Sequence, residues 1–168
     1  MGKVRGFEIV TKYLNDELTI PRRATNASAG YDFAAAKDTV IPSVWKLAGK
    51  EQVGGNSDNI LPSILVPTGI KAYMPSNEYL MLVNRSSNPL KHNLALPNGI
   101  GVIDADYYNN SNNEGEIFVQ LVNYGLEDYT VKKGERIAQG IFTTYYTIDE
   151  EEQISAERSG GFGSTGKD

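Results

Sequence analysis

Residues 116–123 have the sequence EIFVQLVN and carry the clearest two-residue alternation of the chain. In an extended strand, Ile117, Val119 and Leu121 share one face, because successive side chains point to opposite sides of a sheet. The other face is also apolar at Phe118 and Val122, which is typical of a strand that is covered on both sides. This segment therefore predicts a central strand of a buried sheet.

Similar segments recur along the chain. Short runs rich in Val, Ile, Tyr, Phe and Thr predict strands at residues 7–14, 64–74, 78–84, 99–104 and 136–146. The 17 Gly and 7 Pro residues of the 168-residue chain separate these runs with turn signals such as PTG and KKGE. Pro89 suits the first position of a helix, so one short helix is expected after Asn88. We find no internal repeat and no domain boundary, and this pattern predicts a single all-β domain.

The composition excludes several kinds of chemistry. The chain has no cysteine, which removes thiolate catalysis, disulfides and Cys-based zinc sites. His92 is the only histidine, so acid, base or metal chemistry rests mainly on carboxylates. A net charge of −5 without a basic run disfavours a groove for nucleic acid. No apolar run is long enough for a signal peptide or a membrane span, and we expect a cytoplasmic protein.

Three stretches lack strand character. Residues 48–60 are polar and Gly-rich and predict a surface loop. The sequence YNNSNNEGE at residues 108–116 predicts the tip of a hairpin, and neither segment is expected to be catalytic. The C-terminal residues 155–168 carry four glycines up to Gly166 and too few apolar side chains to pack a core. We expect this last segment to be a mobile arm.

Three strings combine groups that could act on a phosphorylated ligand. GVIDADYY at residues 101–108 ends a strand with carboxylates and phenols, which suit water activation and packing on a flat ligand. Most such strings, taken alone, are simply a strand that enters a polar turn. NRSSNP at residues 84–89 suits either a phosphate cradle or a helix cap. AGYDFAAA at residues 29–36 offers one carboxylate, Asp32, as a site group or as a buried turn residue.

Two further strings are weaker by themselves. KKGERIAQGIF at residues 132–142 is a hairpin signal that contains Gln139. The arm at residues 155–168 has the composition of a disordered tail, yet it places Phe162 and Arg158 among its glycines. Freed backbone N–H groups, hydroxyls, a guanidinium and a ring are what a lid over a phosphorylated aromatic ligand requires.

Taken in order, the five strings resemble the five motifs of the trimeric dUTPase family, of the bacterial or phage type. Arg-Ser-Ser stands at residues 85–87, Gly-Val-Ile-Asp-x-Asp-Tyr at 101–107, Gly-Glu-Arg-Ile-Ala-Gln at 134–139 and Gly-Gly-Phe-Gly-Ser-Thr-Gly at 160–166. The resemblance implies hydrolysis of dUTP to dUMP and pyrophosphate. This reaction limits uracil incorporation into DNA and supplies dUMP for dTMP synthesis.

The resemblance implies a role for each matching residue. Asp104 matches the aspartate that activates the water attacking the α-phosphorus, and Tyr107 matches the tyrosine that packs on the deoxyribose and leaves no room for a 2′-hydroxyl. The family reads the uracil edge in a hairpin too tight for the thymine methyl group. The matching residues there are Asn98, Gly101, Val102 and Ile103.

Other matching residues would hold the phosphates and the metal. The phosphate ligands implied by the resemblance are Arg85, Ser86, Ser87 and Gln139, together with Arg158, Ser164 and Thr165 of the arm. Phe162 would close over the uracil. Asp32 matches the residue that holds a magnesium-bound water, and the Mg²⁺ cofactor itself is bound mainly by the three phosphates.

The resemblance also implies an architecture. It suggests a distorted jelly-roll or β-clip domain over residues 1–154, followed by the arm at residues 155–168 that closes over the active site. It further implies a homotrimer in which three subunits contribute to each site. Apart from the dUTP substrate, neither a nucleic acid nor a membrane is an expected partner.

Three departures from the family pattern stand out. Arg158 precedes Phe162 by four residues, whereas many members have one more Gly between them, which affects its expected contact. Asn84 stands where a Pro is common, and we expect this to matter little. The loop at residues 48–60 lengthens the segment between the first two motifs and is either a tolerated insertion or a site for an unknown protein partner.

Two other functions remain open at this point. A dCTP deaminase shares the fold and an Arg-Ser-Ser motif, but its catalytic glutamate falls at Gln120 here, and an amide cannot shuttle a proton. A dUTP-binding regulatory or interaction protein would use the same binding residues. The presence of Asp104 favours catalysis, because binding alone needs no attacking water.

Overall fold

The computed structural model describes residues 2–47 and 63–151, and this part of the chain consists mainly of β-strands and connecting turns. Its helical elements are short: α1 (Val44–Leu47), the 3-10 turns η1 (Thr11–Tyr13) and η3 (Ala105–Tyr107), and the π-helical turn η2 (Asn88–His92). The strands are β1 Gly6–Ile9, β2 Arg22–Arg23, β3 Tyr31–Ala34, β4 Thr39–Ile41, β5 Ile64–Pro67, β6 Ile70–Tyr73, β7 Glu78–Asn84, β8 Leu94–Ala95, β9 Ile100–Asp104, β10 Phe118–Asn123, β11 Tyr129–Val131 and β12 Arg136–Thr144.

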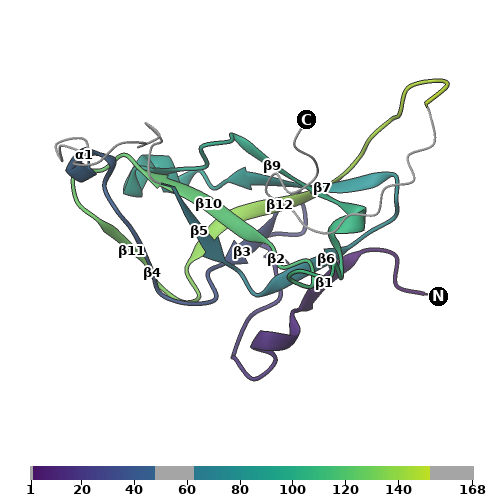
Figure 1. The fold of residues 1–168 in the computed structure, drawn as a ribbon, viewed down its shortest axis with the longest axis horizontal. Helices are drawn as coiled ribbons and strands as arrows, with labels where there is room; N and C mark the ends of the chain where they lie inside the picture. The colour runs from purple at the N-terminus through teal and green to yellow at the C-terminus, as the bar shows by residue number, and fades with distance from the viewer. Residues whose placement is uncertain (1, 48–62, 152–168) are drawn as a thin grey trace.

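These strands pair in antiparallel ladders. The largest sheet of the described residues has the order β2-β3-β12-β7-β9, and the smaller sheets have the orders β5-β10-β8, β1-β6 and β11-β4. Figure 1 shows α1, β4 and β11 at one end of the molecule, and β1 and β6 toward the end that carries the N-terminus. In the largest sheet β12 is the middle strand and β9 is an edge strand. Both carry motif residues, so this sheet positions the candidate site.

The core confirms the prediction made for EIFVQLVN. Strand β10 lies between β5 and β8, and its neighbour Ile117 is fully buried together with Val119 and Leu121. Val122 on the opposite face is buried as well. Burial of apolar side chains on both faces of this strand accounts for the apolar residues found at both alternating sets of positions in the sequence.

Several predicted elements differ in detail. The segment 64–74 is divided into β5 and β6, because Gly69 adopts a φ of +68° that side chains with a Cβ rarely tolerate. The segment 7–14 forms a strand only to Ile9, after which η1 begins at Thr11. Strands β4 and β11 were not predicted, since three residues each give little periodic signal.

The segment 108–116 is not the tip of a hairpin. The strands before and after it, β9 and β10, are not paired with each other: β9 pairs with β7, whereas β10 pairs with β5 and β8. The segment instead connects η3 to β10 by a loop with hydrogen bonds of its own, such as that from the Glu114 N–H to the Asn110 carbonyl at 3.0 Å.

The expected short helix is present as η2, which begins at Asn88 and has Pro89 in its first turn. His92 lies in its last turn, where its ring packs 4.9 Å from that of Tyr129.

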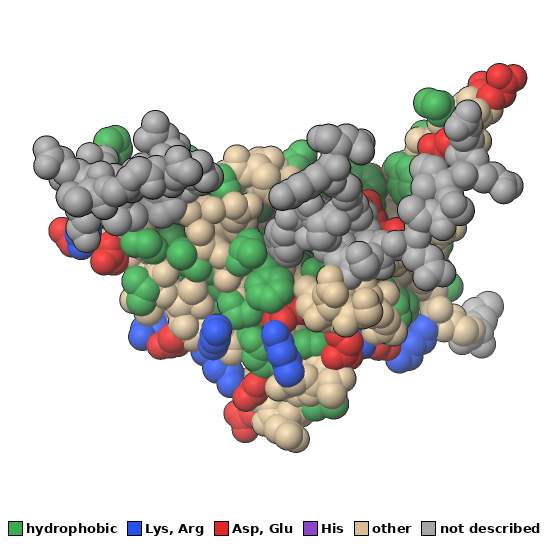
Figure 2. Space-filling view, in the orientation of Figure 1, with side chains coloured by type: hydrophobic (Ala, Val, Ile, Leu, Met, Phe, Trp, Pro, Cys, Tyr) green, Lys and Arg blue, Asp and Glu red, His purple; other side chains and the backbone are tan. Residues whose placement is uncertain are grey.

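Figure 2 shows basic and acidic side chains side by side along the lower edge of the visible face. Over residues 2–47 and 63–151, none of the helices has the length and hydrophobicity needed to cross a membrane.

Candidate active site

A cavity of about 190 Å³ lies beside β9. It brings together six residues that the sequence assigned to the base, the sugar and the attacking water, namely Asn98, Gly101, Val102, Ile103, Asp104 and Tyr107. The remaining wall is largely apolar and is formed by Leu82, Leu96, Ile117, Phe118 and Gln120. An apolar cavity with a few polar groups at one side suits a flat ligand such as a nucleobase.

The entrance to β9 is a tight turn. Gly99 adopts a φ of +69°, and its N–H donates to the Leu96 carbonyl at 3.1 Å. A Cβ at Gly101 would lie 3.1 Å from the Cβ of Leu82, so this glycine lets β9 approach β7 closely. The backbone of β9 therefore lies close to Leu82 of β7, which lines the same cavity.

Tyr107 and Asp104 follow directly from β9. Asp104 is the last residue of this strand, and the chain then turns into η3, which carries Tyr107. The Tyr107 side chain is 4% exposed, and its hydroxyl donates to the Glu116 carbonyl at 2.9 Å. The phenol ring thus lines the cavity while its hydroxyl is directed into the protein.

A second group of predicted residues gathers around Asp32 on β3. The Arg85 Nε atom lies 3.1 Å from one carboxylate oxygen, and the Gln139 amide nitrogen lies 3.4 Å from the same oxygen. The other oxygen accepts a hydrogen bond from Arg136 at 3.0 Å. Asp32 and Gln139 meet because β3 and β12 pair with these two residues opposite each other.

Arg136 is a residue that the sequence assignment missed. It lies in the Gly-Glu-Arg-Ile-Ala-Gln string that gave Gln139, so the motif itself contained the signal. With Arg85, it places two guanidinium groups on a carboxylate whose side chain is only 8% exposed. This cluster offers paired cations for an anionic ligand.

The Arg85-Ser86-Ser87 segment is held by a buried asparagine. Asn88 donates to the Ile137 carbonyl on β12 at 2.7 Å and to the Asn84 side chain at 2.8 Å. Asn84 in turn donates to the Leu94 carbonyl at 3.3 Å. The asparagine that replaces the common proline therefore has a structural part, contrary to our expectation that it would matter little.

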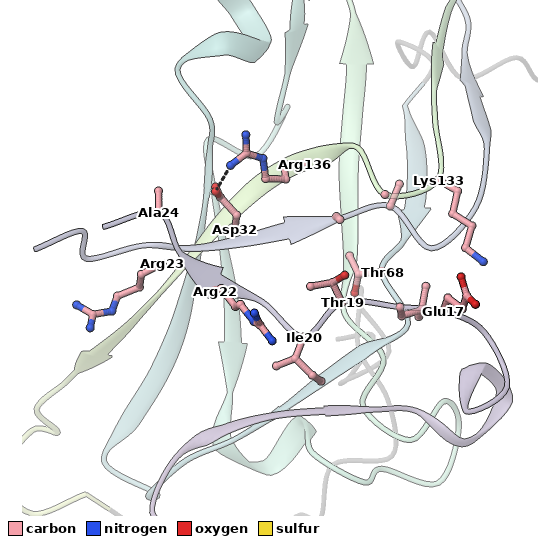
Figure 3. A pocket seen from close by; sticks show the side chains of 14 residues that line it. Glu17, Thr19, Ile20, Arg22, Arg23, Ala24, Asp32, Thr68, Lys133 and Arg136 are labelled. Carbon is pink, nitrogen blue, oxygen red and sulfur yellow. Dashed lines mark hydrogen bonds and ion pairs between the residues drawn. The ribbon is translucent and has the colours of Figure 1, made fainter. Parts of the chain in front are cut away.

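Asp32 lines a second cavity, of about 290 Å³. In Figure 3, Arg136 reaches Asp32 on one wall, Arg22 of β2 lies beneath it, and Lys133 and Glu17 lie at the far end. The Arg23 guanidinium donates hydrogen bonds to the backbone carbonyls of Asn26 and Ser28, so it stabilises the turn that follows β2.

The two groups of predicted residues do not meet within one chain. Through the pairing of β3, β12, β7 and β9, Asp32 is in register with Gln139, Val83 and Ile100, whereas Asp104 lies four residues further along β9. Strand spacing and residue rise place the Cα atoms of Asp32 and Asp104 about 20 Å apart. One triphosphate cannot contact both groups of the same chain.

The acidic residues suit a metal that is bound mainly by substrate. Among residues 2–47 and 63–151, no group of three or more His, Asp or Glu side chains could hold a metal ion. Asp32 is the one acidic side chain of the cluster that contains Arg85, Arg136 and Gln139. A single carboxylate fits Mg²⁺, which keeps most of its waters and needs few protein ligands when phosphates supply the rest.

Some predicted residues lie elsewhere. Arg158, Phe162, Ser164 and Thr165, and the loop at residues 48–60, fall outside the described residues. Ser86 is exposed and Ser87 half-buried in the turn that leads into η2. Gln120, at the position of the deaminase glutamate, lines the cavity beside β9 and donates to the Ser63 hydroxyl at 2.7 Å.

Comparisons with known proteins identify the family and the fold of this chain. The family model for dUTPase matches residues 60–166. The chain is 46% identical over 166 residues to the deoxyuridine 5′-triphosphate nucleotidohydrolase of Lactococcus lactis subsp. lactis, covering 98% of this chain and 99% of that protein. A crystal structure of dUTPase from Streptococcus mutans superposes with a TM-score of 0.73 at 44% identity, covering 86% of this chain and 98% of that one.

A more distant structure shares the fold. It is a variant dUTPase from phage phi11 of Staphylococcus aureus, with a TM-score of 0.65 at 16% identity, which covers 92% of this chain and 98% of that one. That structure is described as revealing the coordination of a structural Mg(II) ion. Together with the Streptococcus mutans structure, it confirms the expected jelly-roll fold class.

Proposed function

This chain belongs to the dUTPase family and hydrolyses dUTP to dUMP and pyrophosphate, and from this we propose how its residues carry out the reaction. One observation carries the proposal: a single cavity holds the β9 turn, Tyr107 and Asp104. These are the groups needed to bind a base, to pack on a sugar and to activate a water beside the α-phosphate.

We assign nucleotide selection to the β9 turn and to Tyr107. The uracil would lie against Asn98 and the backbone from Gly101 to Ile103, where β9 is close to β7. The thymine methyl group and the ribose 2′-hydroxyl both add atoms to the correct substrate. A tight cavity and a packed ring reject such analogues by steric overlap.

The chemical step needs one base and several cations. Asp104 would orient a water molecule and accept its proton as the oxygen attacks the α-phosphorus, and the bond from that phosphorus to the bridging oxygen of the leaving pyrophosphate then breaks. Arg85, Ser86, Ser87 and Gln139 would hold the phosphate chain. Mg²⁺, when bound to the phosphates, would neutralise their charge, with Asp32 holding one of its waters.

The separation within one chain supports a homotrimer with shared sites. Asp104 of one subunit would complete the Asp32 and Arg85 cluster of another, because about 20 Å divides these groups in the same chain. The domain at residues 1–154 would form the body of the trimer. The arm at residues 155–168 would cover the site, with Phe162 on the uracil and Arg158, Ser164 and Thr165 on the terminal phosphate.

The deaminase alternative is disfavoured by one contact. Gln120 occupies the position of the proton-transferring glutamate, and its amide donates to Ser63. An amide does not ionise near neutral pH, so it cannot act as the general acid or base that transfers a proton. We therefore expect no ammonia from dCTP.

The test is a substrate panel. We expect rapid pyrophosphate release from dUTP with Mg²⁺, loss of the reaction in EDTA, and little release from dTTP, UTP or dCTP. Ammonia from dCTP at a rate near that of dUTP turnover would support the deaminase instead. A folded protein that binds dUTP but releases no pyrophosphate would point to a regulatory protein.

A further inference from the structure

The segment 108–116, which we call the asparagine loop, folds back over Tyr107. Gly115 adopts a φ of +82°, and a Cβ there would lie 2.6 Å from the Tyr107 carbonyl oxygen. Only glycine permits this close approach. The loop therefore lies against the residue that we assign to the sugar.

Two asparagines of this loop donate hydrogen bonds to Tyr107, one to its backbone carbonyl and one to its hydroxyl. The Asn110 amide nitrogen donates to the Tyr107 backbone carbonyl at 2.9 Å. The Asn113 amide nitrogen donates to the Tyr107 hydroxyl at 2.8 Å, while that hydroxyl donates to the Glu116 carbonyl. Both the backbone and the phenol of Tyr107 are thus fixed by side chains or backbone of the loop that follows it.

The orientation of the Asn113 amide is itself fixed. Its oxygen accepts from the Asn110 amide nitrogen at 2.8 Å and from the Gly115 N–H at 3.1 Å. Because two donors face the oxygen, the nitrogen must face the phenol. Asn113 consequently acts on Tyr107 as a donor.

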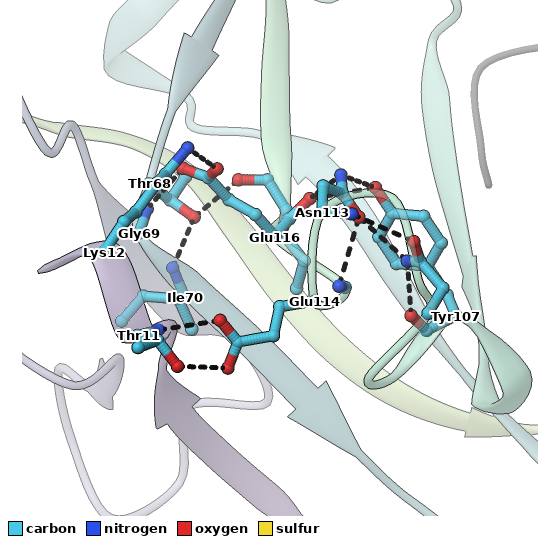
Figure 4. Close-up of polar contacts among 12 residues, drawn as sticks. Thr11, Lys12, Thr68, Gly69, Ile70, Tyr107, Asn113, Glu114 and Glu116 are labelled. Atoms are coloured by element: carbon cyan, nitrogen blue, oxygen red, sulfur yellow. Dashed lines mark hydrogen bonds and ion pairs between the residues drawn. The ribbon is translucent and has the colours of Figure 1, made fainter.

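The outer side of the loop is fastened to the body of the protein. The Glu114 carboxylate accepts hydrogen bonds from Lys71 on β6 at 2.7 Å and from the Thr11 N–H and hydroxyl at 2.9 Å each. Lys71 and Thr11 hold the pKa of Glu114 at about 2. Figure 4 shows the contacts of Thr11 with the Glu114 carboxylate, together with the pairing of buried Glu116 with Lys12 of η1.

We propose that Asn113 is a positioning residue for the sugar site. By holding the Tyr107 hydroxyl, it keeps the phenol ring in the one plane that admits a deoxyribose and rejects a ribose. The proposal rests on the sugar-packing role proposed for Tyr107. A steric filter depends on sub-ångström placement, so a ring whose hydroxyl keeps only its hydrogen bond to the Glu116 carbonyl would distinguish the two sugars less well.

The experiment measures the ratio of kcat/KM for dUTP to that for UTP. We expect Asn113→Ala to lower this ratio roughly tenfold, the effect of one lost hydrogen bond. The fraction of folded enzyme cancels in the ratio, because both substrates report on the same active molecules. Asn112→Ala is the matched control, since Asn112 is exposed on the same loop, and it should leave the ratio within about twofold.

Two further variants test whether Asn113 acts through its hydrogen bond to the Tyr107 hydroxyl. Asn113→Asp keeps the oxygen that accepts from Asn110 and Gly115 but cannot donate to Tyr107, so it should lower the ratio as Asn113→Ala does. In a Tyr107→Phe background, which lacks the phenol oxygen, Asn113→Ala should change the ratio by less than about twofold.

The results distinguish failure of the Asn113 proposal from failure of the sugar role proposed for Tyr107. If Tyr107→Ala collapses the ratio while both Asn113 variants leave it within about twofold, Asn113 has no positioning role and the function proposed for Tyr107 stands. If Tyr107→Ala itself leaves the ratio unchanged, the sugar role of Tyr107 fails, and the Asn113 proposal fails with it.

Discussion

At the scale of single residues, the two aspartates of the Asp-x-Asp pair differ in their surroundings. Asp104 ends β9 and lines the cavity beside Tyr107, whereas Asp106 is exposed on η3. The two carboxylates therefore differ in their access to a ligand bound in the cavity. Of the two, only Asp104 lines the cavity in which we propose that the nucleotide and the attacking water are bound.

Replacing Asp104 by Asn should lower kcat for dUTP by about 10²- to 10⁴-fold, because the amide keeps the shape of the side chain but cannot take a proton. Affinity for dUTP should stay within about tenfold. Single-turnover kinetics and equilibrium binding measure the two quantities. Asp106→Asn is the matched control, and equal losses in both variants would remove Asp104 from its role.

Glu114 should make stability depend on acid pH. Its pKa is lowered from 4.5 to about 2, first by Lys71 and then by Thr11, so its stabilising effect is complete above pH 4.5 and is lost as pH falls toward 2. The side chain is 36% exposed, and solvent screening reduces the effect to about 1–2 kcal/mol.

Glu114→Gln should flatten the fall in unfolding free energy over this interval. Urea unfolding between pH 2 and pH 6 measures the difference from the parent protein. Glu127→Gln serves as the control, because that carboxylate is 84% exposed and pairs with Lys46 at the surface. An unchanged pH profile in Glu114→Gln would contradict the assigned contacts.

At the scale of elements, the loops that follow β7 and β9 matter as much as the strands. Asn88 ties the turn after β7 to β12, and the asparagine loop folds back on Tyr107 after β9. The strands set the register of the motif residues, whereas these loops fix the side chains that face a ligand. Glycine at position 115 is what allows the second loop to close.

Gly115→Ala should destabilise the protein more than Gly134→Ala. Both glycines have a φ of +82°, so both substitutions carry the cost of a left-handed conformation, about 1–2 kcal/mol. A Cβ at Gly134 meets no atom within 4 Å, whereas one at Gly115 would meet the Tyr107 carbonyl at 2.6 Å. Urea unfolding should show an additional loss of about 1–3 kcal/mol for Gly115→Ala. Equal losses would mean that the loop shifts without strain.

At the scale of the whole molecule, the candidate site is divided. The cavity beside β9 and the Asp32 cluster occupy distant positions on the same five-stranded sheet. Neither part alone provides both a base and a phosphate cradle. Association of subunits would join them, and this leads to a complementation test.

Asp104→Asn and Arg85→Ala should each be inactive alone but should regain activity when the two chains are unfolded together and refolded as mixed trimers. If each site takes its phosphate cradle and its aspartate from different subunits, random assortment restores about one quarter of the sites. Pyrophosphate release from the mixture measures the recovery. A mixture as inactive as its parents would show that each site is built from one chain.

Much of this protein followed from its sequence. The alternation of EIFVQLVN predicted the buried strand β10, and the motif strings identified the residues that line the cavity and surround Asp32. Such features are local in the chain, because a side-chain period and a short motif are complete within a few residues. Their signal therefore needs no knowledge of distant contacts.

Other features depend on contacts between segments far apart in the sequence. The sequence did not reveal that Arg136 shares Asp32 with Arg85, that Asn88 reaches β12, or that Asn113 holds the phenol of Tyr107. Each contact requires a strand register or a loop conformation that arises only when the sheets pack together. The division of the site into two parts has the same origin, because the order and the register of the strands in the sheet separate Asp104 from Asp32.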